Sequence, residues 1–516
     1  MISCAARSNL FSLAQSKHQG GRSDFTRIAM APDGASSLQL DVHLPSGRGC
    51  VISLAPESLV SVLKAAAQRH FQRRCLRLTA KGRELDLAAT LTAAGLRDGD
   101  VITGVFQPAK LAAAGLAFAL HAQGGGVVTW GHFIGGGDSG QVKGQLRNVQ
   151  QIKTTPHGAF AAILESGAVV TWGDPDSGGD SSQVQEQLRN VQQIQATYGD
   201  FAATLESGAV MTWADPGGGE RSRQVQGQLR NVQQIQATCI AFAAIMGSGA
   251  VVSWGDPNAG GDSSEVQSQL KKVQQIQATG TAFAAILESG TVVTWGDADC
   301  GGDSSQVQDQ LRNVQQIQAT DTAFAAILKS GAVVTWGYAE GGADSSRVQE
   351  HLRNVQQIQA TCSAFAAILD SGAVVTWGDP DSGGDSSQVR DQLRNVQQIQ
   401  ASRSAFAAIV EQAAVVTWGD PDSGGDSSRV QDQLRNVRQI QASGDAFAAI
   451  LESGHVVTWG YAQFGGDSSQ VQEQLQDVQQ IQATNSAFAA LLGCGAVVTW
   501  GELPGTLPNQ EELDLV

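Results

Sequence analysis

Apolar residues recur along most of the chain in a pattern that aromatic residues anchor at a fixed spacing. Each of the ten tryptophans follows a phenylalanine by 12 residues, and the tryptophans lie 42 residues apart once and 41 residues apart thereafter. The tryptophans are Trp130, Trp172, Trp213, Trp254, Trp295, Trp336, Trp377, Trp418, Trp459 and Trp500. A constant period of this length indicates that one supersecondary unit is copied and stacked. Since a buried aromatic side chain removes about 150–250 Å² from water, two of them predict a core for every repeat.

Each unit contains three short apolar segments that are separated by turn residues. In the third unit these segments are Ile194–Thr197, Phe201–Ala203 and Val210–Trp213. Ser207 and Gly208 separate the last two, and Ser-Gly recurs at this place in other units. Glycine adopts the positive φ that a tight hairpin turn needs. The pattern therefore predicts three short strands in every unit.

A glycine-rich loop and a polar linker follow each tryptophan. In the second unit the linker places Val184, Leu188 and Val191 at positions i, i+4 and i+7, the spacing of a helical stripe. Asp180 or Ser182 is available as an N-cap. We expect a short helix or a tight turn between successive units.

The segments Ala-Phe-Ala-Ala-Ile-Leu, Ser-Gly, Val-Val-Thr-Trp-Gly and Gly-Gly-Asp-Ser together resemble the repeat of the regulator of chromosome condensation family, which also occurs in ubiquitin ligases with a HECT domain. That resemblance implies a mainly β fold, in which residues 107–516 form a propeller-like array of about ten three-stranded repeats. Propellers usually have four to eight blades. An unusually wide closed ring and an open, coiled array therefore both remain possible for ten repeats.

The first 110 residues differ from the repeats in charge. They contain 14 Lys and Arg against 8 Asp and Glu, whereas residues 111–516 contain 19 against 41. Two mainly apolar segments, 38–44 and 49–54, predict a hairpin. A helix follows with Leu59, Val62, Leu63 and Ala66 as its apolar stripe, and later strands are predicted at 76–78 and 101–102.

This order of elements resembles ubiquitin and its relatives, the β-grasp fold, over residues 37–106. The segment Arg77–Leu85 corresponds to ubiquitin's Arg-Leu-Ile-Phe-Ala-Gly-Lys-Gln-Leu. Thr79 replaces the isoleucine at the centre of ubiquitin's recognition patch, and no Gly-Gly follows Val105. The resemblance implies an integral ubiquitin-like domain rather than a conjugated modifier. Residues 1–36 are expected to form a disordered leader, with a targeting peptide as the alternative.

Candidate chemistry in the sequence is sparse. The seven cysteines form no Cys-x-x-Cys motif, which favours a reducing compartment without a metal site. Asp174, Asp176 and Asp180 could hold Ca²⁺, but the spacing departs from that of an EF-hand, and turn formation explains these aspartates better. The histidines show no arrangement that indicates a catalytic triad. We expect no cofactor, no metal and no enzyme activity.

The sequence varies between units in two windows, one before the phenylalanine and one after the tryptophan. Loops of one type gather on one rim of a propeller, where partners commonly bind. Large side chains in these windows are candidate interaction residues, although neutral drift of loop sequences would explain the variation equally well. They are Phe133, Tyr198, Tyr338, Tyr461 and Phe464.

Three functional classes fit these observations. The favoured one is a non-catalytic scaffold or adaptor that binds protein partners, basic ones or members of the ubiquitin pathway. A guanine-nucleotide exchange factor and a non-catalytic component of a ubiquitin ligase are the alternatives that the resemblance implies. Nucleic acid is disfavoured because the repeats are acidic. No run of 18 apolar residues occurs, so no membrane association is expected, and an intracellular location, cytoplasmic or nuclear, is predicted.

Overall fold

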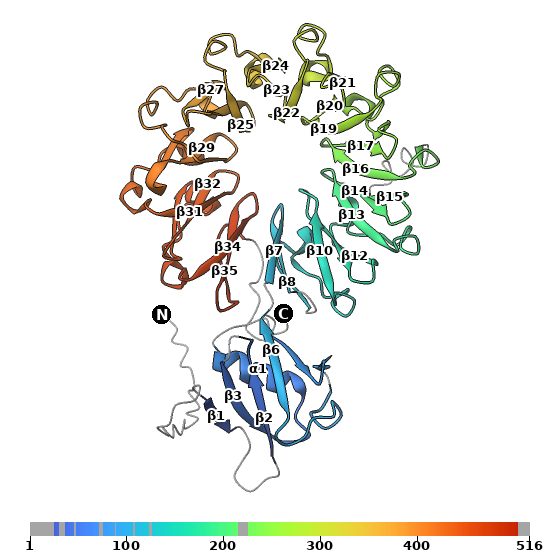
Figure 1. Ribbon diagram of the computed structural model, residues 1–516, viewed down its shortest axis with the longest axis vertical. Coiled ribbons are helices and arrows are strands. Elements are labelled where there is room, and N and C mark those ends of the chain that lie inside the picture. The colour runs from blue at the N-terminus through green and yellow to red at the C-terminus, as the bar shows by residue number, and fades with distance from the viewer. Residues whose placement is uncertain are drawn as a thin grey trace. The chain divides into compact units, whose positions relative to one another are not determined.

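The computed structural model describes residues 25–29, 37–45, 48–71, 76–87, 89–106, 109–122, 126–214 and 225–503. The chain divides into two compact units, residues 1–109 and 110–516. No helix in the described ranges is long and apolar enough to cross a membrane. Figure 1 shows both units with their strands labelled.

The first unit is a six-stranded mixed sheet with one helix. Its elements are β1 (Phe25–Ala29), β2 (Leu38–His43), β3 (Gly49–Leu54), α1 (Val60–Phe71), β4 (Leu76–Ala80), β5 (Arg83–Glu84) and β6 (Val101–Phe106). The strand order is β1-β3-β2-β6-β4-β5, and the central strands β2 and β6 are parallel. The hairpin of β2 and β3, the helix α1 and the later strands β4 and β6 were all predicted from the sequence.

Two features of this unit differ from the prediction. Strand β1 lies within the segment that was expected to be a disordered leader, and it pairs in parallel with β3. The apolar stripe of α1 also differs in part, because the predicted Leu63 and Ala66 enter the core together with Val60, whereas the predicted Leu59 and Val62 are exposed. The hydrogen bond from the Val60 amide to the Ala89 carbonyl begins the helix one residue later than the pattern indicated.

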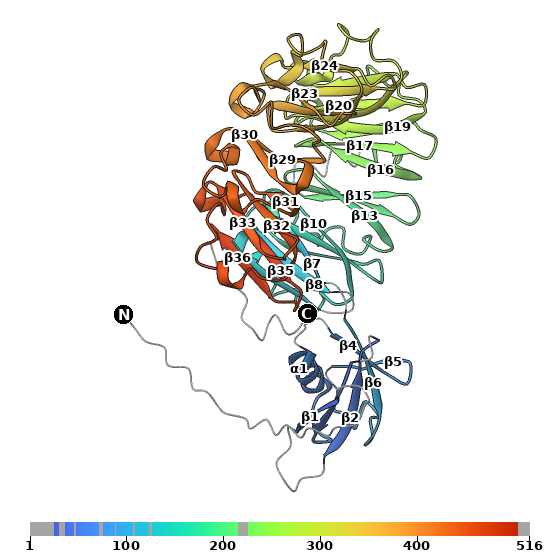
Figure 2. The same ribbon diagram turned by 60° about the vertical axis from the view of Figure 1, so that its left-hand side comes forward.

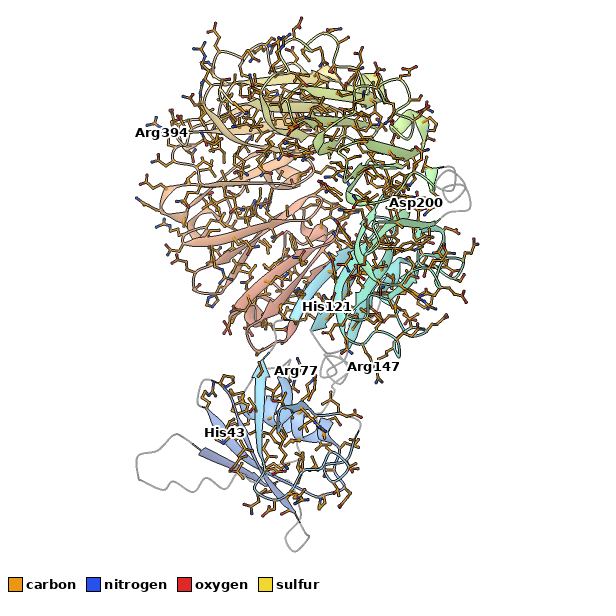
Figure 3. All side chains as sticks on the ribbon, turned by 45° about the vertical axis from the view of Figure 1, so that its right-hand side comes forward. His43, Arg77, His121, Arg147, Asp200 and Arg394 are labelled. Carbon is orange, nitrogen blue, oxygen red and sulfur yellow. The ribbon has the colours of Figure 1, made fainter. Side chains whose placement is uncertain are left out.

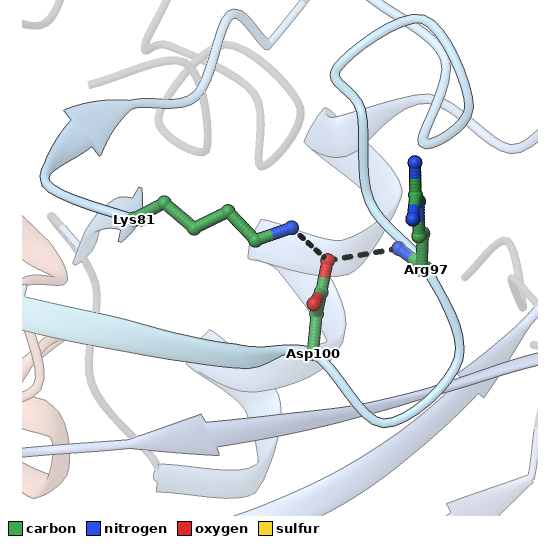
Figure 4. Close-up of polar contacts among 3 residues, drawn as sticks. All are labelled: Lys81, Arg97 and Asp100. Carbon is green, nitrogen blue, oxygen red and sulfur yellow. Dashed lines mark hydrogen bonds and ion pairs between the residues drawn. The ribbon is translucent and has the colours of Figure 1, made fainter.

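A small polar cluster joins the β4–β5 turn to the loop that precedes β6. Lys81 Nζ and the Arg97 amide both donate to Asp100 Oδ2, each at 2.9 Å (Figure 4). The hydrogen bond from Lys81, followed by the one from the Arg97 backbone, lowers the pKa of Asp100. The carboxylate therefore stays ionised and fixes two turns that are 19 residues apart in the sequence.

Each of the ten repeats of the second unit is a three-stranded antiparallel sheet, as predicted. The first strands are β7 (Ala109–Ala114), β10 (Val149–Thr154), β13 (Val191–Ala196), β16 (Val232–Ala237), β19 (Val273–Ala278), β22 (Val314–Ala319), β25 (Val355–Ala360), β28 (Gln398–Ala401), β31 (Val437–Ala442) and β34 (Val478–Ala483). The second strands are β8 (Ala117–Ala122), β11 (Ala159–Leu164), β14 (Asp200–Leu205), β17 (Ala241–Met246), β20 (Ala282–Leu287), β23 (Ala323–Leu328), β26 (Ala364–Leu369), β29 (Ala405–Ile409), β32 (Ala446–Leu451) and β35 (Ala487–Leu492). The third strands are β9 (Val127–Gly131), β12 (Val169–Gly173), β15 (Val210–Ala214), β18 (Val251–Gly255), β21 (Val292–Gly296), β24 (Val333–Gly337), β27 (Val374–Gly378), β30 (Val415–Gly419), β33 (Val456–Gly460) and β36 (Val497–Gly501).

Short helical turns occur mainly in the loops after the tryptophans. They are η1 (Phe133–Gly137), η2 (Pro175–Ser177), η3 (Pro257–Ala259), η4 (Ala298–Gly302), η5 (Ala339–Ala343), η6 (Pro380–Ser382), η7 (Glu411–Ala413), η8 (Pro421–Gly425), η9 (Gln431–Gln433), η10 (Ala462–Phe464) and η11 (Gln472–Gln474). In Figure 1 the first strands lie on the inner side of the second unit. Figure 2 shows the succession of β13, β16 and β19 from another direction.

The hydrophobic core is repeated between every two neighbouring sheets. On β11, Ala159, Ala161 and Ile163 pack against the following repeat, whereas Phe160 and Ala162 pack against the preceding one. Both faces of the second strand are therefore buried, which explains why it reads as a continuous apolar run. In all ten repeats the phenylalanine stacks on its tryptophan, with ring centroids 5.0–5.5 Å apart.

The tryptophans also connect successive repeats through hydrogen bonds. Trp295 Nε1 donates to the Gly260 carbonyl of the preceding loop at 2.9 Å, and seven other tryptophans make the equivalent bond. Trp130 and Trp254 have no such partner among the described residues. The glycine that would serve Trp254, Gly219, lies outside those residues.

In the described residues the linkers form turns, with a single 3-10 turn in two of them, rather than the predicted two-turn helix. In the second repeat, Asn190 adopts a positive φ of 55° and separates the turns at 181–188 from Val191, the first residue of β13. Leu188 and Val191 still enter the same core, but from two different elements. A side-chain hydrogen bond holds the linker against the third strand, because Gln185 Nε2 donates to the Val169 carbonyl at 2.8 Å. The alternative of a tight turn is therefore confirmed.

The second unit closes on itself as a ring. The amide of Asn485 in the tenth repeat donates to the carbonyl of Gly115 in the first at 3.3 Å. Phe118 and Trp130 of the first repeat are 0 % and 1 % exposed, although an open array would leave this end face in water. In Figure 1 the strands β34 and β7 lie next to each other at this junction. Of the two arrangements that the sequence left open, the structure shows the ring.

The first repeat carries a buried polar residue that the others lack. His121 occupies the position of Ile163 on β11, is 4 % exposed, and lies within the first repeat (Figure 3). Its Nδ1 atom has no hydrogen-bond partner among the described residues. Burial, reinforced by the positive charge of Lys110, lowers the pKa of His121 to about 4. The side chain is therefore neutral at physiological pH.

Candidate functional site: the variable rim

The loops between the first and second strands form a circle that is hydrogen-bonded at nine of its ten steps. In the described repeats, nine backbone N–H···O=C bonds of 2.8–3.3 Å join equivalent residues of successive loops. They run from His157 through Tyr198, Cys239, Gly280, Asp321, Cys362, Arg403, Gly444 and Asn485 to Gly115. The remaining step is a close approach, because a Cβ atom on Gly115 would lie 2.2 Å from the Pro156 carbonyl oxygen.

This circle brings the first variable window of all ten repeats together. Hydrogen-bonded chains lie about 5 Å apart, so ten loops enclose a ring roughly 15–20 Å across at this level. Side chains of distant repeats consequently affect one another. A hydrogen bond with Cys239, with a smaller contribution from the charge of Asp321, raises the pKa of Tyr198 to about 12. Burial and then the charge of Asp321 raise the pKa of Cys362 to about 11.

The loops after the tryptophans leave the sheets at the same end as this circle. Threonine side chains join the two sets of loops: Thr320 Oγ1, for example, donates to the Gly341 carbonyl at 2.8 Å. The Tyr338 amide likewise donates to the Thr322 carbonyl. The two variable windows therefore form one surface, which we call the variable rim. It comprises both sets of loops in the described part of residues 115–503.

Carboxylates dominate the variable rim. Every fully described loop after a tryptophan carries one to three of them, and Arg403 is the single Lys or Arg in the described loops of the rim. Other cations, such as Arg147 and Arg394, belong to the linkers (Figure 3). Since charges of one sign on one surface reinforce each other's potential, the rim attracts cationic groups.

Several of these aspartates also organise the loops, as the sequence indicated. Asp174 Oδ1 accepts the Asp176 amide at 3.1 Å, and Asp303 Oδ1 accepts the Ser305 amide at 2.8 Å. The latter hydrogen bond lowers the pKa of Asp303. In the described ranges no group of three or more His, Cys, Asp and Glu side chains is arranged to hold a metal ion.

Four of the five predicted interaction residues are exposed on the variable rim. Phe133 is 71 % exposed, Tyr198 44 %, Tyr338 49 % and Tyr461 43 %. Phe464 differs, because its ring is half-buried against the core between the last two repeats and meets Tyr461 edge to face at 5.3 Å. Phe464 is therefore mainly a packing residue.

Two further exposed apolar residues were not singled out from the sequence. Ile134 is 57 % exposed beside Phe133, and Ile240 is 48 % exposed in the circle of loops. Comparison of the loops would have identified Ile134, because Phe133-Ile134 stands where seven of the nine other repeats have proline or alanine followed by a polar residue. Exposed pairs of large apolar residues are uncommon on monomeric surfaces and are typical of binding sites.

Grooves separate neighbouring loops of the variable rim. The groove between the first and second repeats has a volume of about 710 Å³ and is lined by Phe133, Ile134, Asp138 and Asp180. Equivalent grooves of about 790 and 970 Å³ lie between repeats four and five and between repeats six and seven. The last of these contains two cations, Arg347 and Arg390.

Comparisons with known proteins give similarity to solved structures only. No family model matches the chain, and no curated protein matches it. The computationally designed protein Ika8 shares 13 % identity over 61 % of this chain and 96 % of its own, with a TM-score of 0.30. Yeast RCC1 (Prp20), in its crystal structure with Kap60, shares 17 % identity over 55 % of this chain and 82 % of its own, with a TM-score of 0.31. Ubiquitin of Caldiarchaeum subterraneum shares 22 % identity over 14 % of this chain and 96 % of its own, with a TM-score of 0.14.

Proposed function

We propose that the protein is a non-catalytic interaction scaffold whose variable rim binds basic protein partners. The observation that carries this proposal is the combination of exposed aromatic side chains and unbalanced carboxylates on one rim of a rigid ring. Aromatic residues supply most of the binding energy in protein interfaces, and complementary charge gives orientation and fast association. The hydrogen-bonded circle holds these loops in fixed positions, which lowers the entropy lost on binding.

The chemistry of the cysteines supports a non-catalytic role. Burial raises the pKa of Cys50 to about 12 and that of Cys362 to about 11. Since the thiolate is the nucleophile, both side chains are unreactive near neutral pH.

The first unit, by this proposal, links the scaffold to the ubiquitin pathway. Its sheet has an open face on which Val101 and Val105 are 57 % and 38 % exposed and Thr79 is half-buried. Together with Arg77, which lies opposite Val105 on the paired strand, these side chains form a surface suited to a protein partner.

The test is a quantitative pull-down from cell lysate with the full-length protein as bait. The rim variant combines Asp299→Asn, Asp381→Asn and Asp422→Asn, which are exposed loop positions. A matched control removes three charges near the Ser-Gly turns through Glu165→Gln, Glu206→Gln and Glu452→Gln. We expect the rim variant, and not the control, to lose basic partners.

A separate variant tests the link to the ubiquitin pathway. Val105→Glu is expected to reduce the capture of proteasome or ubiquitin-pathway proteins while basic partners are retained.

Equal capture by the wild type and the rim variant would reject the scaffold proposal. Capture of a nucleotide-free small GTPase by the wild type would favour the exchange-factor alternative instead.

A further inference from the structure

The groove between the first and second repeats differs from its counterparts in the chemistry of its lining. At its edge, Phe133 and Ile134 are 71 % and 57 % exposed. The residues at the same loop positions in the fourth repeat are Pro257 and Asn258, which line the equivalent groove of about 790 Å³. The backbone architecture is thus retained, and an apolar pair replaces a proline and an amide.

Charge distinguishes this groove from the one between repeats six and seven, whereas the groove between repeats four and five is also free of Lys, Arg and His. Asp138 and Asp180 line it, whereas Lys, Arg and His are absent from its lining. The groove between repeats six and seven holds Arg347 and Arg390 and is therefore partly neutralised. The carboxylates of the first groove are fixed, because Asp138 Oδ1 accepts the Gly140 amide at 2.7 Å and Asp180 Oδ1 accepts the Ser182 amide at 2.8 Å.

We propose that this groove is the docking site for a short basic segment of a partner protein that carries an apolar anchor side chain. This inference rests on the proposed scaffold function and adds one anchored site to the electrostatic contacts that the other loops of the variable rim make with basic partners. The anchor packs on Phe133 and Ile134, and flanking Lys or Arg side chains pair with Asp138 and Asp180. Apolar burial supplies affinity, and the carboxylates select a cationic sequence and exclude acidic ones.

The geometry restricts the occupant to a segment of this kind. A purely basic chain would leave two large apolar side chains in water, and a purely apolar one would bury two carboxylates without a positive charge to pair with, which is costly. Several other loops of the rim are more acidic than that of the first repeat but offer no comparable apolar pair, so they are expected to bind cationic segments weakly and without an anchor.

The test measures fluorescence anisotropy of a labelled peptide with the full-length protein. The probe is Gly-Lys-Arg-Lys-Leu-Leu-Lys-Arg-Lys-Gly, and its companion replaces the two leucines by serine. We expect the wild type to bind the leucine peptide at least roughly tenfold more tightly than the serine peptide, as the loss of a central anchor predicts. Affinity should fall as salt is raised, because the flanking contacts are between exposed charges.

Matched variants locate the site. Phe133→Ser with Ile134→Ser should weaken binding of the leucine peptide by roughly tenfold. Pro257→Ser with Asn258→Ser, at the same positions of the equivalent groove, should change it less than about twofold. Asp138→Asn with Asp180→Asn keeps the acceptor oxygens of both turns and should reduce the dependence on salt. Far-UV circular dichroism checks that every variant retains its strands.

Two results would overturn the proposal. If the Phe133 and Ile134 variant binds as tightly as the wild type, or if the control loses as much affinity, the groove is not the docking site. The pull-down with the rim variant decides separately whether the scaffold function holds. Loss of basic partners there, together with unchanged peptide binding here, would reject the groove and retain the scaffold. Failure of the wild type to bind the leucine peptide also rejects the groove.

Discussion

His121 makes the free energy of unfolding of the ring decrease as the pH falls. Burial lowers its pKa from an ordinary value of 6.5 to about 4. The unfolded chain therefore binds more protons than the folded one between these values, and stability rises with pH through this window. This contribution is almost fully present above pH 6.5 and is lost as the pH falls toward 4. Linkage between the two pKa values gives a loss of about 2 kcal/mol at pH 5 relative to pH 7.

His121→Ile should abolish this loss, because it installs the side chain that β11 carries at Ile163. The variant should also be more stable than the wild type at pH 5, since no buried imidazole is then left to protonate. The assay is urea unfolding followed by tryptophan fluorescence at pH 7 and pH 5. All ten tryptophans lie between residues 130 and 500, so the signal reports on the repeats and not on the first unit.

His455→Ala is the matched control. His455 is exposed and stands where seven of the nine other repeats have alanine, so its removal should leave the acid sensitivity of the wild type intact. If the wild type and His121→Ile lose the same stability between pH 7 and pH 5, the assignment of His121 as a buried neutral residue is refuted.

Three further predictions concern the repeat. Trp295→Ala should destabilise the ring by about 3–5 kcal/mol, because it leaves a cavity in the core and removes the hydrogen bond to the Gly260 carbonyl. A loss of stability below about 1 kcal/mol in urea unfolding would contradict this prediction. Gly301→Ala should lower the free energy of unfolding by about 2–4 kcal/mol, since φ is +95° and the new Cβ atom would lie 2.6 Å from a phenylalanine ring. Gly144→Ala has open space around the new Cβ atom and should change stability little. Equal losses of stability in the two variants would contradict the explanation by close packing. Asp303→Asn should leave the melting temperature nearly unchanged with and without Ca²⁺, because the amide oxygen still accepts the same hydrogen bond. A large increase in melting temperature on adding Ca²⁺ to the wild type, and not to the variant, would instead indicate a metal site.

The structural features within one repeat were predicted correctly because they depend on local chemistry. The alternation of apolar residues, the Ser-Gly turn and the aromatic pair each report on which faces of a strand are buried. The register Phe160–Trp172 follows directly from a 12-residue spacing around a tight turn. The loop aspartates could likewise be assigned to turns, since an Asx hydrogen bond reaches only two residues along the chain.

The linker shows where local reasoning failed. Leu188 and Val191 have helical spacing, yet they enter the core from a turn and a strand, because the core between two sheets needs both side chains and Asn190 takes a left-handed conformation between them. Phe464 was likewise expected to be an exposed anchor but packs against the core of the following repeat. In both cases contacts with a neighbouring repeat override the pattern within one repeat.

By itself, the sequence determined the unit of this protein: its length, its three strands, its aromatic core and the acidity of the loops at one end. Tertiary structure alone decided that ten units close into a ring, through the contact between Asn485 and Gly115. Closure depends on the small rotation between neighbouring sheets, which accumulates over all repeats and is not encoded at any single position. The same accumulation brings Tyr198 close enough to Asp321 for that carboxylate to contribute to the raised pKa of the tyrosine, and it sets Phe133 and Ile134 at the edge of a groove.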